Sequence, residues 1–320
     1  MPMDEKALTA ASLAYGQDRA GRRAAAAARL TEVSAKDPRI GEIADEMRLA
    51  GLAAVRAAMD GTPEEARARV EEAKVRDLAL QNERAQRLEA LGYPADYLYA
   101  GPFCEACGDT GYAGGKPCGC FKPFYTAALM AQFNAALGRG IPAFDEGFFL
   151  KADAVEDPKA FLARCRRYAA GCGASGQNLL LRGGPGRGKT MLAAYIGREA
   201  IRCGTEVLYV SAPDYFTLRE EERFRRDPEA AAEAARYRSC TALVLDDLGL
   251  EAQSSGNPAA LLGLLGAREA AGLPTVLCTA LSPRELEARY SGAAASRLEN
   301  GFMPVELRSG DLRRVFRAAF

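Results

Sequence analysis

The sequence predicts an α/β fold, in which a parallel sheet is covered by helices on both faces. From Asn178 onward, short apolar runs alternate with helical patterns, which is typical of such a sheet. Residues 179–190 read LLLRGGPGRGKT and match G-x-x-x-x-G-K-[ST] between a strand and a helix. The apolar run 241–245 then ends in Asp246 and Asp247. Together these observations predict a P-loop core.

The composition limits the classes of function. The 320 residues include 42 basic and 42 acidic side chains, so any contact with DNA must come from a local patch. There is no histidine, which excludes histidine-based catalysis and histidine-containing metal sites. We find no signal-peptide pattern and no apolar run of about 20 residues, so we expect a soluble, cytoplasmic protein without a membrane partner. The nine cysteines then suit metal ligands or buried thiols better than disulfides.

Residues 1–100 are expected to form a helical, partner-binding N-terminal region. Asp37-Pro38 and the capping-box pattern at 62–65, TPEE, both have the residue types that begin helices. The apolar stripe of the second of these helices is thin, because Asp77 and Arg84 interrupt it. Two interpretations stay open, a partner-binding arm and a small self-contained helical domain.

Residues 101–122 hold four cysteines in a short, glycine-rich stretch. The pairs are Cys104 and Cys107, spaced C-x₂-C, and Cys118 and Cys120, spaced C-x-C. Tight turns around paired thiols suit a tetrahedral Cys₄ zinc site, which would supply much of the local folding free energy. The alternative is four reduced surface thiols without a metal. The other cysteines are expected to be small buried residues: Cys165, Cys172, Cys203, Cys240 and Cys278.

Residues 123–174 are expected to be a helical connector, with helices near 124–137 and 158–170. Residues 175–320 then form the core. The strands of the core are expected near 178–181, 206–210, 241–245, 273–279 and 303–307. Its helices are expected at 189–203, from Asp214, at 258–271 and from the capping box at Ser282.

The P-loop pattern predicts a binding site for a nucleoside triphosphate. Glycines let the backbone wrap closely around phosphate oxygens, and the following helix points its N-terminus at the same anion. Lys189 is expected to reach the β- and γ-phosphates, and the Thr190 hydroxyl to hold Mg²⁺. The expected nucleotide-binding residues are Gly183, Gly184, Pro185, Gly186, Arg187, Gly188, Lys189, Thr190 and Met191.

The two carboxylates after the third strand predict the catalytic part of the site. A buried strand ending in acid places both groups at the carboxyl edge of the sheet, beside the P-loop. We expect Asp246 to orient Mg²⁺ through its water shell and Asp247 to activate the attacking water.

Two groups of basic residues are candidates for intermolecular contacts by their charge alone, the first with DNA or a neighbouring subunit and the second with DNA. One group follows the second strand, where neighbouring glutamates make a solvated, salt-bridged face the favoured interpretation. Its members are Arg219, Arg223, Arg225 and Arg226. The other group consists of Lys122, Arg164, Arg166 and Arg167.

Residues 90–317 resemble the DnaC/DnaI-type replicative helicase loaders, in the AAA+ clade that includes the IstB transposition helper ATPases. The resemblance rests on the cysteine stretch with its flank ADYLYAGPF, on NLLLRGGPGRGKT, ALVLDDLGLE, TVLCTALSPRELEARY, SRL and GDLRR. It implies a five-stranded AAA+ core, ATP-dependent self-association, contact with single-stranded DNA, and a ring-shaped replicative hexameric helicase as partner. It also implies that the helical N-terminus binds the helicase.

The resemblance assigns further roles and reveals two departures. Arg297, after Ser296, corresponds to the arginine supplied to a neighbour's γ-phosphate. Thr279 lies in the sensor that ends the fourth strand. The family's Ser-Thr-Asn is here Cys-Thr-Ala, so Ala280 replaces the amide, and Ala293 stands where an arginine is usual. Both departures remove polar groups from the γ-phosphate side, so we expect ATP binding with slow hydrolysis.

Three functions are compatible with these features. The first is a loader that uses ATP to deliver or remodel a replicative helicase on single-stranded DNA. The second is an IstB-like transposition helper ATPase, and the third is a non-hydrolysing adaptor that ATP and zinc stabilise.

Overall fold

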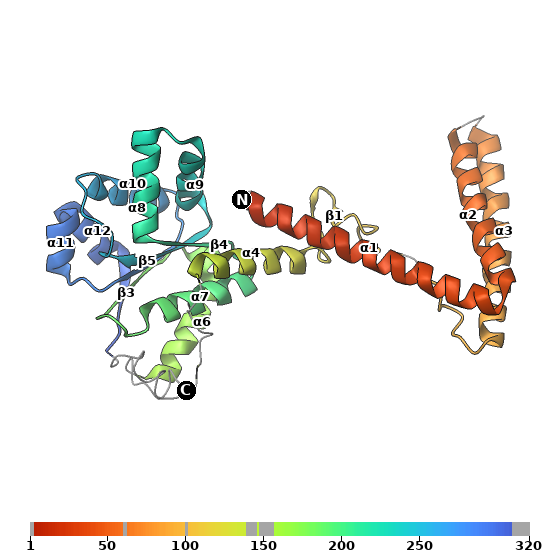
Figure 1. Cartoon of the computed structure of the whole chain (residues 1–320), viewed down its shortest axis with the longest axis horizontal. Helices are drawn as coiled ribbons and strands as arrows, with labels where there is room; N and C mark the ends of the chain where they lie inside the picture. The colour runs from red at the N-terminus through yellow and green to blue at the C-terminus, as the bar shows by residue number, and fades with distance from the viewer. Residues whose placement is uncertain (1–2, 60–62, 100–101, 139–145, 147–156, 309–320) are drawn as a thin grey trace. The chain divides into compact units, whose positions relative to one another are not determined.

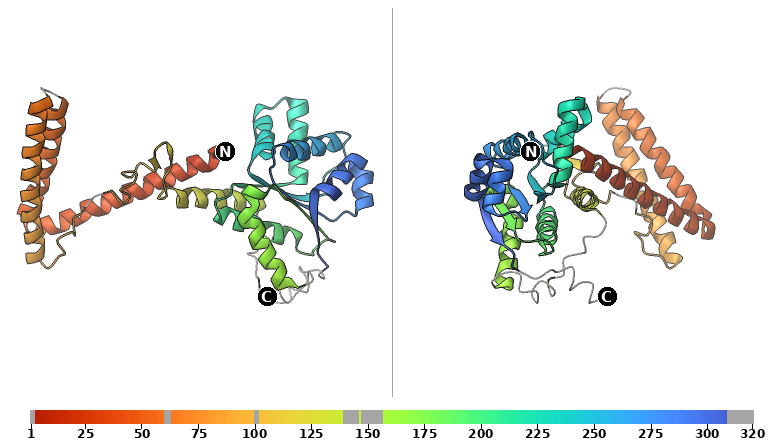
Figure 2. Two further views of the ribbon diagram at one scale, coloured as in Figure 1. Left: turned by 180° about the vertical axis from the view of Figure 1, so that it is seen from behind. Right: turned by 60° about the vertical axis from the view of Figure 1, so that its left-hand side comes forward.

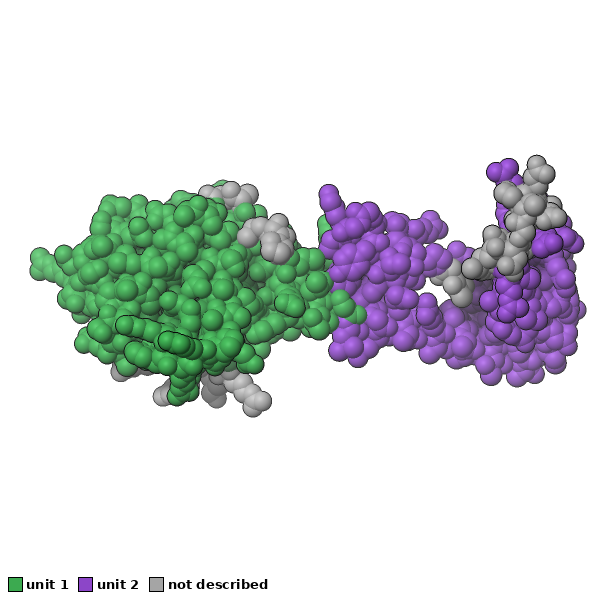
Figure 3. Space-filling view, turned by 90° about the horizontal axis from the view of Figure 1, so that it is seen from above, with its two compact units in different colours: residues 1–12, 122–320 green, residues 13–121 purple. Residues whose placement is uncertain are grey.

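The computed structural model describes residues 3–59, 63–99, 102–138, 146 and 157–308. The chain forms two compact units, shown in Figure 3. One comprises Met1–Ser12 and Lys122–Phe320, and the other Leu13–Phe121. The expected capping-box residue Thr62 and the expected motif at 310–314 lie outside the described residues.

The larger unit is built on a parallel five-stranded sheet, which confirms the predicted fold class. Its strands occur in the order β4-β5-β6-β3-β7 and are all parallel to their neighbours. Their bounds are β3 (Asn178–Arg182), β4 (Val207–Ser211), β5 (Ala242–Leu248), β6 (Thr275–Thr279) and β7 (Phe302–Glu306).

Helices cover both faces of this sheet (Figures 1 and 2). One face carries α4 (Lys122–Leu137), α6 (Pro158–Ser175) and α7 (Lys189–Arg202). The other face carries α8 (Ala212–Glu220), α10 (Asn257–Ala270), α11 (Pro283–Tyr290) and α12 (Gly292–Gly301). The π-helix η1 (Glu221–Arg225) and α9 (Pro228–Ser239) complete the connection between β4 and β5. Side chains of each strand alternate between the two cores, for example Leu179 and Leu181 against Leu180.

The helices of the expected connector pack directly on the core. Phe133 of α4 is almost fully buried, and a side-chain carbon on Gly197 of α7 would lie only 2.3 Å from its ring. Glycine at this position therefore lets α4 and α7 approach each other closely. The start of α1 (Glu5–Lys36) belongs to the same unit, because Asp4 pairs with Arg236 of α9 at 2.5 Å.

The smaller unit consists of the rest of α1, the helices α2 (Pro38–Met59) and α3 (Pro63–Ala90), and a short hairpin. The hairpin strands are β1 (Tyr112–Ala113) and β2 (Lys116–Pro117). Charges link the two helices of the α2–α3 pair. Arg39 of α2 donates to Glu83 of α3 at 2.9 Å, and Arg87 of α3 donates to Asp37 at 3.0 Å.

Most local predictions in the chain are confirmed. Asp37 accepts the Arg39 N–H at 3.0 Å as helix α2 begins, and Ser282 and Glu285 form the expected capping box. The helix expected from Asp214 begins two residues earlier, because Ser211 caps it. One expectation was wrong: Cys203 is exposed, since it follows the last turn of α7 at the surface.

Candidate functional site

The P-loop connects β3 to α7 through three glycines with positive φ. The φ values are 154° at Gly183, 77° at Gly186 and 85° at Gly188. A side chain at Gly183 would also lie 2.8 Å from the Leu307 carbonyl oxygen. Only glycine meets these requirements without strain, so the residue types of the motif follow from the shape of the loop.

Lys189 lies over this loop with its ammonium group against the backbone. The side chain is buried, and Nζ donates to the carbonyl oxygens of Gly183 at 2.7 Å and Gly184 at 3.0 Å. Helix α7 begins at Lys189 after Gly188, which provides no side-chain cap. The N-terminus of α7 and the lysine thus present positive charge at one place, as a phosphate site requires. Thr190 follows in the first turn.

Asp246 is fully buried near the carboxyl end of β5, and both of its carboxylate oxygens accept hydrogen bonds. The backbone N–H of Asp247 donates to Oδ1 at 2.8 Å, and the Tyr209 hydroxyl donates to Oδ2 at 3.0 Å. These bonds hold the carboxylate in one orientation. Burial and the Asp246 charge raise the pKa of Tyr209, so the phenol stays a donor.

Asp247 has a left-handed backbone conformation, with φ of 56°. The pairing of β5 with β6 shifts register between Leu245 and Leu248, around this residue. Such conformations are strained for residues other than glycine and are common at active sites. This irregularity interrupts the regular pairing of the strand at Asp247.

Cys278 belongs to β6, the strand between β3, which precedes the P-loop, and β5, which carries the acidic pair. This thiol is fully buried. Burial, and after it the Asp246 carboxylate, raises its pKa well above the ordinary value, while the nearby Lys189 ammonium acts in the opposite direction. Because β6 lies between β3 and β5 and the three strands are parallel, Lys189, Asp246 and Asp247 all lie at the carboxyl edge of the sheet. A threonine hydroxyl and carboxylates beside a P-loop are a donor set that fits Mg²⁺.

The Thr279 hydroxyl forms hydrogen bonds with the backbone of the protein. The group donates to the Leu248 carbonyl oxygen at 2.7 Å and accepts the Leu281 N–H at 3.1 Å. It therefore holds the end of β6 against the end of β5. Ala280 follows directly and adds only a methyl group.

Glu251 is a buried residue of the acidic motif whose role the sequence pattern does not predict. Its carboxylate accepts hydrogen bonds from Arg289 at 2.8 Å, from the Gly249 N–H at 2.9 Å and from the Tyr290 hydroxyl. Burial alone would raise the pKa of Glu251, but these donors lower it. The network ties the turn after Asp247 to helix α11. Its sequence signal was the glutamate that ends LDDLGLE.

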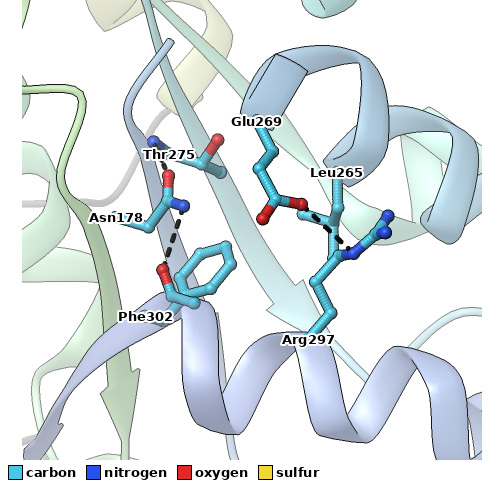
Figure 4. A pocket seen from close by; sticks show the side chains of 7 residues that line it. Asn178, Leu265, Glu269, Thr275, Arg297 and Phe302 are labelled. Atoms are coloured by element: carbon cyan, nitrogen blue, oxygen red, sulfur yellow. Dashed lines mark hydrogen bonds and ion pairs between the residues drawn. The ribbon is translucent and has the colours of Figure 1, made fainter. Parts of the chain in front are cut away.

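Arg297 lies apart from this group, on α12 (Figure 4). Its Nε forms an ion pair with Glu269 of α10 at 3.2 Å, and a side-chain carbon on Gly266 would lie 2.9 Å from its Nη1. It lines a small pocket with Asn178, Thr275 and Phe302.

That pocket lies at the amino edge of the sheet. Asn178, Thr275 and Phe302 are the first residues of β3, β6 and β7, and all three strands are parallel. The P-loop follows the carboxyl end of β3. The structure therefore brings Lys189, Asp246 and Asp247 together and leaves Arg297 at the opposite edge.

The four cysteines of residues 101–122, a stretch called the cysteine knuckle below, converge. Their Sγ atoms all lie within 4.8 Å of one another, with Cys104 and Cys118 3.6 Å apart and Cys107 and Cys120 3.5 Å apart. Tetrahedral coordination at the usual Zn–S distance of about 2.3 Å places sulfurs about 3.8 Å apart. Asp109 accepts the Cys104 N–H at 3.0 Å and shapes the first turn. The residues therefore fit a Cys₄ metal site.

The basic groups expected from the sequence are partly engaged in ion pairs. Arg219 pairs with Glu222, and Arg225 with Glu221 at 3.5 Å, in line with the salt-bridged interpretation. Arg166 of the other group pairs with Glu146.

Comparison with known proteins supports an ATP-binding domain. Residues 172–295 match the family model described as IstB-like ATP binding protein. A putative insertion sequence ATP-binding protein of Sinorhizobium fredii is 34% identical over 118 residues, which cover 36% of this chain and 38% of that protein. The chain thus spans well under half the length of this curated relative. The matched region is similar to these ATP-binding proteins and includes the P-loop and the acidic strand.

Two solved structures match about half of this chain. The crystal structure of DnaI has a TM-score of 0.44 and 22% identity, covering 52% of this chain and 95% of that one. The DnaC helicase loader has a TM-score of 0.42 and 18% identity, covering 56% of this chain and 99% of that one. Within the described residues, no helix is both long and apolar enough to span a bilayer.

Proposed function

We propose that the chain is a Mg²⁺-dependent ATPase of the IstB/DnaC-like AAA+ type. The placement of Lys189, Asp246 and Asp247 at the carboxyl edge of the parallel sheet carries this proposal. Lys189 binds the β- and γ-phosphates together with the backbone of residues 183–191. Thr190 and Asp246 hold Mg²⁺, which neutralises charge on the phosphates, and Asp247 orients and activates water. Lys189→Ala should abolish binding of a fluorescent ATP analogue, whereas Asp247→Asn should retain binding and lose turnover.

Hydrolysis is proposed to be slow. Ala280 cannot orient water or phosphate, and the Thr279 hydroxyl already binds the backbone of residues 248 and 281. ATP then acts chiefly as an assembly signal. A turnover below about 1 s⁻¹, under the usual range of enzymes, is expected in a phosphate-release assay. A rate that Ala280→Asn does not increase would contradict this explanation.

Arg297 is proposed to act on the nucleotide of a neighbouring copy in an ATP-dependent homo-oligomer. Its place at the amino edge of the sheet, opposite the P-loop, supports action in trans. Guanidinium suits the task because it stays charged and binds phosphate oxygens bidentately. Mixing Arg297→Ala protein with Lys189→Ala protein should restore turnover, because each supplies what the other lacks. A mixture as inactive as its components would exclude action in trans.

We further propose that Cys104, Cys107, Cys118 and Cys120 bind one structural Zn²⁺. The spacing of their sulfur atoms supports this assignment. Metal analysis of protein purified without chelator should give one zinc per chain, and Cys107→Ser should lower this content.

The biological role proposed first is that of a helicase loader. ATP binding would let the chain deliver a replicative hexameric helicase to single-stranded DNA, with residues 1–100 contacting the helicase. The knuckle next to a helical N-terminal region supports this role. The purified chain should co-elute with the replicative helicase of its host, and removal of residues 1–92 should abolish the complex. Co-elution that survives this truncation would contradict the assignment of the helical region.

The second candidate role is that of a transposition helper. The similarity to a putative insertion sequence ATP-binding protein favours it. Such a protein would coat duplex DNA, and long ATP-dependent filaments on duplex DNA in electron micrographs would support this role over the loader.

The third role, a non-hydrolysing adaptor, is favoured by Ala280. It predicts that Asp247→Asn protein still supports assembly of the partner complex, whereas the enzymatic roles predict that assembly stops at an intermediate.

A further inference from the structure

Helix α1 contacts the cysteine knuckle through Tyr15. The tyrosine is 5% exposed, and its hydroxyl oxygen lies 3.3 Å from Sγ of Cys120. Both residues belong to the smaller unit. We propose that Tyr15 is an outer-shell hydrogen-bond donor to metal-bound Cys120, and that metal binding thereby fastens the knuckle to helix α1. This inference rests on the zinc site proposed above.

The tyrosine ring fits its place closely. It packs edge-on against Phe121, with ring centroids 5.6 Å apart and an interplanar angle of 74°. Gly111 lies against both rings, and a side-chain carbon there would be 3.2 Å from Tyr15 and 3.3 Å from Phe121. Gly111 also has φ of 81°, so both the close approach of the rings and the backbone conformation favour glycine here. Packing of the ring thus positions the phenol independently of the hydrogen bond of its hydroxyl.

A second contact lies two helical turns further along α1. The guanidinium of Arg22 lies 4.5 Å from the ring centroid of Phe103, which directly precedes Cys104. Residues seven apart lie on one face of a helix, so Tyr15 and Arg22 point the same way. The same face of α1 therefore reaches both cysteine pairs, at Cys120 and next to Cys104.

The metal decides the direction of the Tyr15 hydrogen bond. Between a phenol and a free thiol, either atom can donate. A thiolate bound to Zn²⁺ has no proton, so the tyrosine must donate and the bond becomes charge-assisted. Zn²⁺ with four thiolates has a net charge of −2, and outer-shell donors stabilise such ligands. Metal and helix therefore strengthen each other's binding to the knuckle.

The test compares Tyr15→Phe with Tyr112→Phe in the full chain. Tyr112 provides a matched control, because its ring also packs on Phe121, at 5.4 Å, and it is 40% exposed. Zinc affinity is measured by competition with a chromophoric chelator. Loss of the Tyr15 hydroxyl should weaken binding by about 10–100-fold, the usual effect of removing an outer-shell partner, and the control variant by less than about twofold. In the cobalt-substituted protein, the thiolate-to-metal charge-transfer band should shift only in Tyr15→Phe.

Hydrogen exchange tests whether metal binding fastens the knuckle to helix α1. Removal of zinc from wild-type protein should increase amide exchange in residues 13–23 as well as in the knuckle. Arg22→Gln should increase exchange in the same stretch and, since it touches no ligand, should weaken zinc binding less than Tyr15→Phe does.

Each outcome separates the two proposals. A wild-type chain that binds no zinc overturns the zinc site. One zinc per chain, with equal affinity in Tyr15→Phe and Tyr112→Phe, overturns the role of Tyr15 and leaves the zinc site intact. Unchanged exchange in residues 13–23 on zinc removal overturns the fastening of α1. If Tyr15→Phe fails to fold, the exchange measurements on wild type and on Arg22→Gln still decide.

Discussion

Replacing Tyr209 by phenylalanine is expected to destabilise the region around β5 in the nucleotide-free protein. The substitution keeps the ring, which packs edge-on against Phe133 at 6.0 Å, and removes only the hydroxyl. Asp246 then loses one of its two hydrogen bonds while its carboxylate remains fully buried. A hydrogen bond to a charged group contributes about 1.5–3 kcal/mol, so we expect a loss of that size.

Hydrogen exchange of peptides from β5 measures this loss. Because the chain forms two compact units, its global unfolding need not be two-state, and a local readout is preferable. In an Asp246→Asn background the same substitution should cost only about 0.5–1.5 kcal/mol, because the acceptor is neutral. Tyr195→Phe is the control. Its hydroxyl accepts from Arg166 at 3.0 Å, and its effect should not depend on residue 246.

Equal losses for Tyr209→Phe in the wild-type and Asp246→Asn backgrounds would refute this reasoning. They would mean that the contribution of the Tyr209 hydroxyl does not depend on the charge of Asp246. A loss below about 0.5 kcal/mol would mean that water replaces the hydroxyl, and that Asp246 is less enclosed than its burial indicates.

Three further changes test the larger unit. Gly197→Ala should cost about 1–3 kcal/mol in thermal unfolding through overpacking against Phe133, and adding Phe133→Leu should recover part of it. Burial, and after it the Asp4 charge, raises the pKa of Glu206 above its ordinary value of 4.5. The folded state therefore favours the protonated form of Glu206, and the protein loses stability as the pH rises through the raised pKa. Glu206→Gln should therefore stabilise at pH 7, with a gain in urea midpoint that disappears below about pH 4.5. Arg268 is fully buried and donates to backbone carbonyls before β5 and β6, so Arg268→Lys should cost more than about 2 kcal/mol by the same urea assay.

The P-loop and the acidic strand end could be predicted because each is a local pattern. Their residue types follow from the shape of the loop and from the end of one strand, and neither needs information about distant residues. The pairing of Tyr209 with Asp246 could not be predicted in this way, since it joins residues 37 apart in the sequence through the register of β4 and β5. A tyrosine in an otherwise apolar strand was nevertheless a signal, because a buried phenol usually needs a partner.

The α2–α3 pair shows where apolar periodicity is insufficient. Its stripe looked too thin for a core, and its buried apolar cluster is indeed small, including Ile40 and Leu88. The sequence shows that both helices carry complementary charges, but it does not show which of these charged side chains pair with each other. Arg39 of α2 contacts Glu83 of α3, 44 residues away, through two hydrogen bonds between partly buried side chains. The choice between partner-binding arm and self-contained domain therefore depends on partners rather than on this pattern.

The position of Arg297 bears on how assembly would be controlled. Its partner Glu269 is more than half exposed, and an exposed ion pair contributes at most about 1 kcal/mol. A bidentate contact between arginine and phosphate is charge-assisted and stronger, so Arg297 can leave Glu269 at little cost. The guanidinium lies close to Gly266 and also donates a long hydrogen bond to the Leu262 carbonyl oxygen, at 3.5 Å. In the proposed oligomer, the nucleotide of the neighbouring copy, and not this ion pair, would determine when Arg297 engages.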